Sequence, residues 1–167
     1  MEIERKFAVV KVPDNLECYH KKKIEQGYLC HNPILRIRKS NDQYILTYKS
    51  KFGIDESSSK AIVVNETELM LNQSAYESLK SKVEGNTIKK TRYIIPLDRT
   101  LIAELDVFGG KLSGLVIVEV EFPDEETADK FIAPEWFGED LSKDVRFGNY
   151  YLSKLDSIDE LGMRKNH

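Results

Sequence analysis

Charged residues recur two positions apart in segment after segment of this 167-residue chain. Successive side chains of a β-strand point to opposite faces, so residues two apart share a face. Seven segments carry such sets, namely Glu2/Glu4/Lys6, Arg36/Arg38, Lys49/Lys51, Glu66/Glu68, Lys90/Arg92, Glu104/Asp106 and Glu119/Glu121. One set is typical of a strand that faces water. Seven sets that each contain a same-sign pair, acidic on some strands and basic on others, indicate that something else neutralises each group.

Turn residues divide the chain into about eight predicted strands with short connections. We expect strands near residues 1–10, 24–29, 34–39, 43–51, 60–69, 88–96, 101–108 and 115–122. Helical patterns are predicted at 73–83, at 124–132 and from Tyr150 to Leu161. Short turns in place of regular crossover helices favour an antiparallel sheet or barrel. Neither a linker nor a repeat interrupts the chain, so we expect one α+β domain over residues 1–167.

Closing this sheet with its charged faces inward would give an eight-stranded antiparallel β-barrel. The apolar faces would then form the outer wall, and the three helices would pack on the outside. A barrel of this size is wide enough to hold one small ligand. Unpaired charges in its interior would each cost several kcal/mol. The lumen is therefore expected to be a wet tunnel that is filled by a polyanion together with metal ions.

The charged residues have the chemistry that such a ligand requires. Carboxylates suit Mg²⁺ or Mn²⁺, which prefer oxygen ligands, and guanidinium and ammonium groups suit phosphate. The candidate metal ligands are Glu2, Glu4, Glu119 and Glu121. The candidate phosphate-binding residues are Lys6, Arg36, Arg38, Lys49, Lys90 and Arg92.

The composition limits the classes of partner and the cellular location that we expect. A net charge of −3 is too small for an overall footprint on DNA or RNA, so no nucleic acid is expected. Cys18 and Cys30 lie outside any CxxC pattern, and two reduced thiols are expected. Without a leader or a long apolar run, we expect no membrane segment and a cytoplasmic location. The pattern leaves the oligomeric state open.

The opening ExExK at Glu2, Glu4 and Lys6 is followed by nine further segments that match one family in the expected order. They are IEQGYL from Ile24, RxR from Arg36, LTYK ending at Lys49, ExE from Glu66, KTRY from Lys90, ELDVF with Gly110, GLVIVEVEF from Gly114, PEWFGEDLS from Pro134, and Arg146 with Asn149 and Leu152. Together they resemble the CYTH domain family, also called the triphosphate tunnel metalloenzymes. The resemblance implies an eight-stranded tunnel that binds a linear triphosphate and hydrolyses or rearranges it with a divalent metal.

The resemblance also implies roles for individual residues. Tyr28 matches a position that acts as proton acceptor or helps the leaving group; because a phenol is a weak acid, a cation such as Lys6 or Lys90 would have to assist it. These three form the implied catalytic set. The implied phosphate-binding residues are Lys6, Arg36, Arg38, Lys49, Lys90, Arg92 and Arg146. The implied metal ligands are Glu2, Glu4, Glu119, Glu121, Glu66, Glu68 and Asp106, with Glu104 completing the acidic wall.

The chain departs from the family pattern at several positions. Val64 stands where many members carry a further acid, which weakens the metal-binding role of that strand. Val145 replaces a basic residue or proline, and Phe147 replaces a common tyrosine, so hydrogen bonding near Arg146 would be reduced. The loop at 51–61 is longer and more polar than usual, which is consistent with a lid but is more often simply a mobile hairpin.

Several functions fit this tunnel. The leading hypothesis is metal-dependent hydrolysis of inorganic triphosphate to pyrophosphate and phosphate. It is supported by the single small domain, in which we expect no appended module that would present RNA or a regulator. An adenylyl cyclase would need purine contacts that the sequence does not reveal, and hydrolysis of thiamine or nucleoside triphosphates is a third enzymatic alternative. A non-catalytic polyphosphate-binding module is the alternative of another class, although binding alone would favour bases over so many carboxylates.

Overall fold

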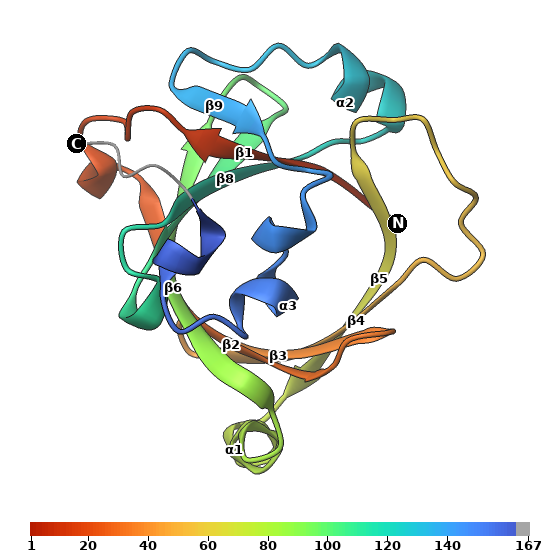
Figure 1. Cartoon of the computed structure of the whole chain (residues 1–167), viewed down its shortest axis with the longest axis vertical. Coiled ribbons are helices and arrows are strands. Elements are labelled where there is room, and N and C mark those ends of the chain that lie inside the picture. The colour runs from red at the N-terminus through yellow and green to blue at the C-terminus, as the bar shows by residue number, and fades with distance from the viewer. Residues whose placement is uncertain (163–167) are drawn as a thin grey trace.

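Eight antiparallel strands close into a barrel in the structure, a computed structural model that describes residues 1–162 (Figure 1). The strands are β1 (Glu2–Val9), β2 (His20–Cys30), β3 (Ile34–Ser40), β4 (Gln43–Ser50), β5 (Ile62–Leu71), β6 (Glu84–Pro96), β7 (Ile102–Phe108) and β8 (Val116–Glu121). Their order is β5-β4-β3-β2-β6-β7-β8-β1, and a further β5–β1 pairing closes the ring. The predicted fold class is confirmed.

Strand β1 has two neighbours on one of its edges. Its first half pairs with β5, where Glu2 lies opposite Val64. Its second half pairs with an additional strand, β9 (Phe137–Asp140), through Phe7 and Val9. The sequence analysis did not predict β9, because its four residues carry no alternating pattern. The exchange of partners along β1 lets the barrel close at one end and extend its sheet at the other.

Two helices pack on the outside of the barrel, as predicted. Helix α1 (Gln73–Lys80) starts at Asn72, whose side chain accepts a hydrogen bond of 2.8 Å from the Ala75 N–H, and it packs against β3 and β4. Helix α2 (Glu125–Lys130) is capped in the same way by Asp124 and lies against β1. Short 3-10 turns also occur at Leu16–Cys18, Gly110–Leu112, Val145–Phe147 and Ile158–Leu161. Within residues 1–162 no helix is long and apolar enough to cross a membrane.

The single helix predicted from Tyr150 to Leu161 is wrong. Helix α3 covers only Asn149–Leu152, and a separate 3-10 turn covers Ile158–Leu161. Between them, Ser157 is extended and forms a capping box with Glu160, which starts a new helical turn. The local preference of Ser157 for a cap therefore interrupts the helix that the apolar spacing favoured.

The C-terminal segment fills one end of the barrel and does not cover its outside. Tyr28 pairs in register with Arg36, and Ile117 pairs with Asp106, so these apolar residues face the lumen beside the charged ones. They are buried in one cluster with Phe147 of the C-terminal segment. Helix α3 lies inside the ring of strands in Figure 1. The lumen is therefore a cup with an apolar floor, and the predicted outside position of the third helix is corrected.

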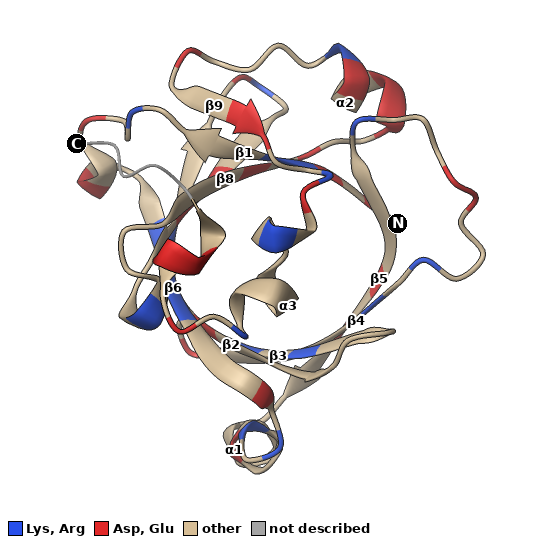
Figure 2. Ribbon diagram, in the orientation of Figure 1, with Lys and Arg blue, Asp and Glu red and all other residues tan. Residues whose placement is uncertain are grey.

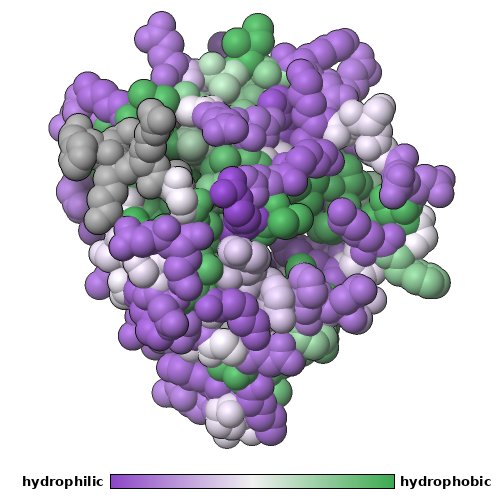
Figure 3. Space-filling view, in the orientation of Figure 1, coloured by the Kyte–Doolittle hydropathy of each residue, from purple (hydrophilic) through white to green (hydrophobic). Residues whose placement is uncertain are grey.

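A second apolar cluster lies under the outer elements. Ile3 and Phe7 of β1 pack there with Val118 and Val120 of β8, beneath α2 and β9. These are outward-facing positions of the alternating pattern, so the predicted inversion of charged and apolar faces is confirmed. In the view of Figure 3 the molecular surface is mostly hydrophilic, and hydrophobic residues gather around its middle.

Candidate active site

The charged half of the lumen is a cavity of about 380 Å³. Strands from all around the barrel contribute residues to it, and Figure 2 shows charged positions along the ring of strands. Its acidic lining residues are Glu2, Glu4, Glu66, Glu68, Glu104, Glu119 and Glu121. Its basic ones are Lys22, Arg36, Arg38, Lys49 and Arg92, and Asn149 reaches it from α3. Ten residues of the predicted site thus line one cavity: Glu2, Glu4, Arg36, Arg38, Lys49, Glu66, Glu68, Arg92, Glu119 and Glu121.

One wall of the cavity, formed by β6, β7 and β8, is paired internally. Asp106 accepts hydrogen bonds of 2.7 Å from Lys90 Nζ and of 2.7 Å from both Nε and Nη2 of Arg92. Burial would raise the pKa of the Asp106 carboxyl, but Arg92 and Lys90 hold it below its usual value. Both carboxylate oxygens are committed to cations, so the arrangement does not support Asp106 as a metal ligand.

The same network extends to the edge of the cavity. Glu119 lies 3.6 Å from Lys6 Nζ and 3.4 Å from Arg92 Nη2, and Glu104 contacts the other end of the Arg92 guanidinium. Burial lowers the pKa of Lys90 to about 8, although Asp106 opposes the shift. Lys6 and Lys90 are buried and do not line the cavity themselves.

The wall formed by β2, β3 and β4 is different, because its two arginines have only neutral partners. Arg36 Nη2 donates to Thr47 Oγ1 at 3.2 Å, and Arg38 donates to Gln26 Oε1 from Nε at 3.0 Å and from Nη2 at 2.8 Å. Neither arginine forms an ion pair with any residue in 1–162. Burial, together with the charges of Arg36 and Arg92, lowers the pKa of Arg38 to about 9. This wall therefore presents positive charge that the protein does not neutralise.

Carboxylates without cationic partners face this positive wall. Glu4 and Glu121 are directly opposite each other on β1 and β8, and neither forms an ion pair within the described residues. Burial raises the pKa of Glu4 to about 7, and the charge of Glu119 adds to the effect. Burial and the charge of Glu2 also raise the pKa of Glu121. Two like charges held together in this way are stabilised by a cation between them.

The acidic residues fit a hard divalent cation by chemistry. Glu2 and Glu66 share Lys49, at 2.7 Å and 3.1 Å from its Nζ, and Glu104 and Glu119 contact Arg92. Among the carboxylates that line the cavity, Glu4, Glu121 and the exposed Glu68 have no ion pair within residues 1–162 and have oxygens to offer. No three acidic, His or Cys side chains converge on one point among residues 1–162. Mg²⁺ does not require this, since it is commonly held by one or two carboxylates together with phosphate oxygens and water.

Tyr28 lies in the apolar floor and does not line the cavity. Its hydroxyl accepts a hydrogen bond of 3.3 Å from Gln26 Nε2, and its ring meets Tyr150 edge to face. The predicted role of Tyr28 in proton transfer stays a prediction. The sequence analysis missed the roles of Gln26, Thr47 and Asn149, because neutral polar residues do not stand out in a pattern of charges.

Arg146 lies away from the cavity, although it was expected to bind phosphate. Its guanidinium pairs with Asp144 at 2.6 Å and donates to the Leu161 carbonyl at 3.1 Å. Adjacent Phe147 points into the floor instead. This arrangement does not support a phosphate-binding role for Arg146, because the 3-10 turn at Val145–Phe147 directs Phe147 and not Arg146 into the barrel.

The polar loop at 51–61 is fastened to α2. Ser59 Oγ donates to Asp129 at 2.9 Å, and the Lys60 N–H donates to the same oxygen at 2.8 Å. Lys143 Nζ also donates to the Ala61 carbonyl at 2.7 Å. These contacts hold the end of the loop against the outside of the barrel, so they favour neither a lid over the cavity nor a free hairpin.

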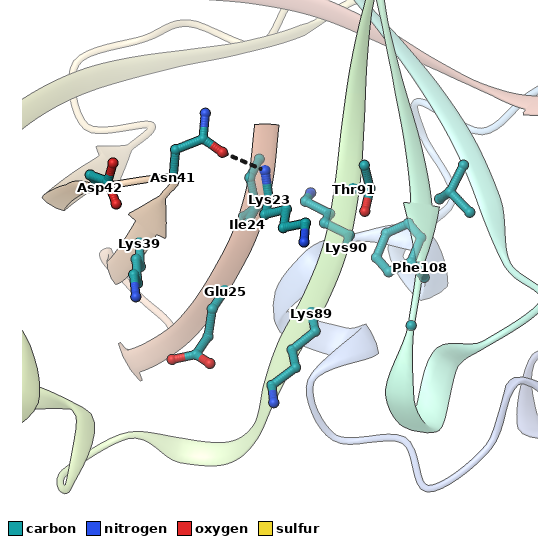
Figure 4. Close-up of a pocket in the computed structure, with 12 residues that line it drawn as sticks. Lys23, Ile24, Glu25, Lys39, Asn41, Asp42, Lys89, Lys90, Thr91 and Phe108 are labelled. Atoms are coloured by element: carbon teal, nitrogen blue, oxygen red, sulfur yellow. Dashed lines mark hydrogen bonds between the residues drawn. The ribbon is translucent and has the colours of Figure 1, made fainter. Parts of the chain in front are cut away.

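A larger hollow of about 860 Å³ lies on the outer wall of β2, β6 and β7. Lys39, Glu25 and Lys89 extend along it in Figure 4, where Asn41 accepts a hydrogen bond from the Lys23 N–H at 2.9 Å. Its charges are solvated, and Glu25 is already paired with Lys80 at 2.7 Å. The smaller inner cavity, which concentrates buried charge, is therefore the better candidate for chemistry.

The comparisons with known proteins agree with this geometry. A family model described as the CYTH domain matches residues 1–154. The chain belongs to the CYTH domain family. A CYTH relative from Nitrosomonas europaea, named inorganic triphosphatase, is 39% identical over 155 residues, which are 91% of this chain and 96% of the relative. Another from Acetivibrio thermocellus, also named inorganic triphosphatase, is 33% identical and covers 92% of this chain and 93% of its own.

Solved CYTH structures show the same barrel. The crystal structure of an inorganic triphosphatase is 38% identical, has a TM-score of 0.65, and covers 92% of this chain and 94% of its own. A Hippeastrum protein, described as a 'putative adenylyl cyclase' that reveals a dominant triphosphatase activity, is 20% identical with a TM-score of 0.61, over 93% of this chain and 97% of its own. At that identity the second likeness shows the fold alone.

Proposed function

We propose that this CYTH protein hydrolyses inorganic triphosphate to pyrophosphate and phosphate with the help of Mg²⁺ or Mn²⁺. The observation that carries the proposal is the pair of guanidinium groups without carboxylate partners, one buried and one partly buried, which face carboxylates without cationic partners across one 380 Å³ cavity. A linear polyanion with its metal would neutralise both sets at once. The names of the two curated relatives support this substrate over the alternatives.

The basic residues would bind and orient the triphosphate. Arg36 and Arg38 offer planar donor groups for phosphate oxygens, and Lys49, which is half-buried between Glu2 and Glu66, offers an ammonium group. Phosphoryl transfer through a loose transition state depends mainly on such positioning and charge neutralisation. The fixed guanidinium groups would therefore both select the substrate and hold it in line for attack.

The carboxylates would hold the metal. Glu4 and Glu121 are the strongest candidates, with Glu2 and Glu119 beside them in the same part of the cavity. A bound divalent ion would neutralise phosphate charge and supply water of lowered pKa. We also propose that Tyr28, Lys6 and Lys90 serve proton transfer from beneath the cavity, where Lys90, with its pKa lowered to about 8, can exchange a proton near neutral pH.

The test is a product assay. The protein is incubated with tripolyphosphate, ATP and thiamine triphosphate, each with Mg²⁺ or Mn²⁺, and the products are resolved by chromatography. We expect equal amounts of phosphate and pyrophosphate from tripolyphosphate, with the other substrates turned over more slowly. Cyclic AMP from ATP would instead identify a cyclase, and metal-dependent binding without turnover would identify a binding module.

Matched lysine variants connect the activity to the cavity. Lys49→Gln removes a charge from the lumen, whereas Lys89→Gln removes the same charge from the outer wall. We expect the first variant to lose most of the activity and the second to retain it. Equal activity of the two variants would contradict the assignment of the inner cavity as the active site.

A further inference from the structure

The two uncompensated arginines are anchored by buried neutral side chains. In register, Gln26 on β2 lies opposite Arg38 on β3, and Thr47 on β4 lies opposite Arg36. Gln26 and Thr47 are both 0% exposed. A buried polar side chain is retained only when its hydrogen bonds are satisfied, and here the partners are the guanidinium groups. The anchors therefore fix the two arginines from neighbouring positions on the same inner face of the sheet.

The orientation of the Gln26 amide is set by its two neighbours. Arg38 has only donors, so the oxygen of the amide must face it and accepts both the Nε and Nη2 hydrogen bonds. The amide nitrogen then faces Tyr28 and donates to its hydroxyl at 3.3 Å. A carboxylate in this place would hold Arg38 with stronger hydrogen bonds, as Asp106 holds Arg92, but it would cancel the charge.

We propose that Gln26 and Thr47 are positioning residues that aim the guanidinium groups of Arg38 and Arg36 at the triphosphate while leaving their positive charge available to it. The inference rests on the proposed function for the identity of the ligand. It adds that the affinity for the ligand depends on the neutrality of these anchors, and not only on the presence of the arginines.

The decisive variant is Gln26→Glu, which keeps the size of the anchor and its acceptor oxygen for Arg38 and adds one negative charge. The contact with Tyr28 is kept only in the reverse direction, with the Tyr28 hydroxyl as donor. A merely structural role for Gln26 predicts that stability and affinity change together. The proposal predicts that they separate: the melting temperature stays the same or rises, while tripolyphosphate binds roughly 10- to 100-fold more weakly. In the hydrolysis assay the KM for tripolyphosphate should rise by a similar factor, with a smaller change in kcat.

Three further variants isolate the cause. Gln43→Glu adds the same charge at the exposed rim of the cavity, where Gln43 has no hydrogen bond to Arg36 or Arg38, and it should weaken binding less than about threefold. Gln26→Met removes the hydrogen bonds without adding charge and should weaken binding less than Gln26→Glu. Thr47→Val removes only a hydroxyl, and a loss of affinity of about threefold is expected.

Binding is measured by calorimetry with tripolyphosphate in the presence of a chelator, so that metal-dependent hydrolysis does not consume the ligand, alongside thermal unfolding of the ligand-free protein. Hydrolysis is measured separately, in the product assay with Mg²⁺ or Mn²⁺. Unchanged affinity in Gln26→Glu, or an equal loss in Gln26→Met and Gln26→Glu, would overturn the proposal. If Gln26→Glu does not fold, wild-type affinity in both Gln26→Met and Thr47→Val would overturn it as well. Wild-type protein that binds tripolyphosphate without hydrolysing it would refute the proposed function alone, whereas absence of binding would refute both proposals.

Discussion

Two walls of the same lumen hold arginines in opposite ways. On β6–β8, Arg92 forms ion pairs with Asp106, Glu104 and Glu119, and these carboxylates neutralise its charge. On β2–β4, Arg36 and Arg38 donate hydrogen bonds to the neutral side chains of Thr47 and Gln26, which do not neutralise their charge. The residue type is the same on both walls, so the chemical nature of the partner decides whether an arginine serves the fold or the ligand.

The difference has consequences for stability. Removing one member of a buried ion pair leaves the other charge without compensation, which is strongly destabilising. Removing an arginine that lacks a charged partner leaves no charge uncompensated, and the cost is limited to the lost hydrogen bonds of its neutral anchor. The paired wall should therefore respond to mutation mainly through folding, and the unpaired wall mainly through binding.

The largest effect on folding is expected from Asp106→Asn. This change leaves Lys90 and Arg92 buried without their shared carboxylate, whose side chain is fully buried. We expect the free energy of unfolding, measured by urea denaturation, to fall by about 3–5 kcal/mol. The double variant with Lys90→Met should recover part of this loss. Wild-type stability of Asp106→Asn would mean that the paired wall is not structural.

Arg38→Met tests the opposite wall. Because Arg38 has no ion pair in residues 1–162, the ligand-free protein should keep its melting temperature within a few degrees. Its kcat/KM for tripolyphosphate should fall roughly 100-fold, since charge-assisted hydrogen bonds to the substrate are lost. A large fall in melting temperature with normal kinetics in the remaining folded protein would reverse the assignment of the two walls.

The carboxylates without partners predict an unusual dependence of stability on pH. The pKa of Glu4 is raised from 4.5 to about 7, so between these values the native state binds more protons than the unfolded state. The free energy of unfolding of the metal-free protein should therefore decrease as the pH rises through this window. Thermal unfolding in the presence of a chelator should show a shallower decrease for Glu4→Gln than for the wild type. Parallel curves for the two proteins would contradict a raised pKa of Glu4.

The smallest effect concerns the rim of the paired wall. The Glu104 side chain is 37% exposed, so its contact with Arg92 is screened by water. Glu104→Gln should change the free energy of unfolding by less than about 1 kcal/mol. If urea denaturation showed a loss of unfolding free energy as large as that of Asp106→Asn, the stability contribution of these two carboxylates would not depend on their depth in the barrel.

Much of the fold and the cavity could be predicted because strand alternation is a local property. The position of Glu2 and Glu4 on the same face follows from their spacing alone, and their place in the cavity bears this out. Strand alternation did not predict the apolar end of the lumen. Tyr28 and Ile117 also face inward, but they pack against the apolar C-terminal segment. The spacing of residues within one strand does not predict which end of the lumen is occupied by a distant segment of the chain.

The charge balance of the cavity could not be predicted from the sequence. Whether Arg92 or Arg38 is neutralised depends on the register between strands, which places Asp106 opposite the first and Gln26 opposite the second. Arg146 was assigned to the site by family resemblance, but a local pair with Asp144 holds it elsewhere. The register between β2, β3 and β4 would have to be known to identify Gln26 and Thr47 as partners of the arginines.

Calorimetric titration of tripolyphosphate into wild-type protein and the Arg36→Met/Arg38→Met double variant, with a chelator present so that no metal-dependent hydrolysis occurs, tests the central claim most directly. We predict saturable binding to the wild type and no measurable binding to the double variant, whose thermal unfolding remains cooperative at a similar temperature. Binding of wild-type affinity by the folded double variant would contradict the claim that the uncompensated arginines of β3 hold the triphosphate.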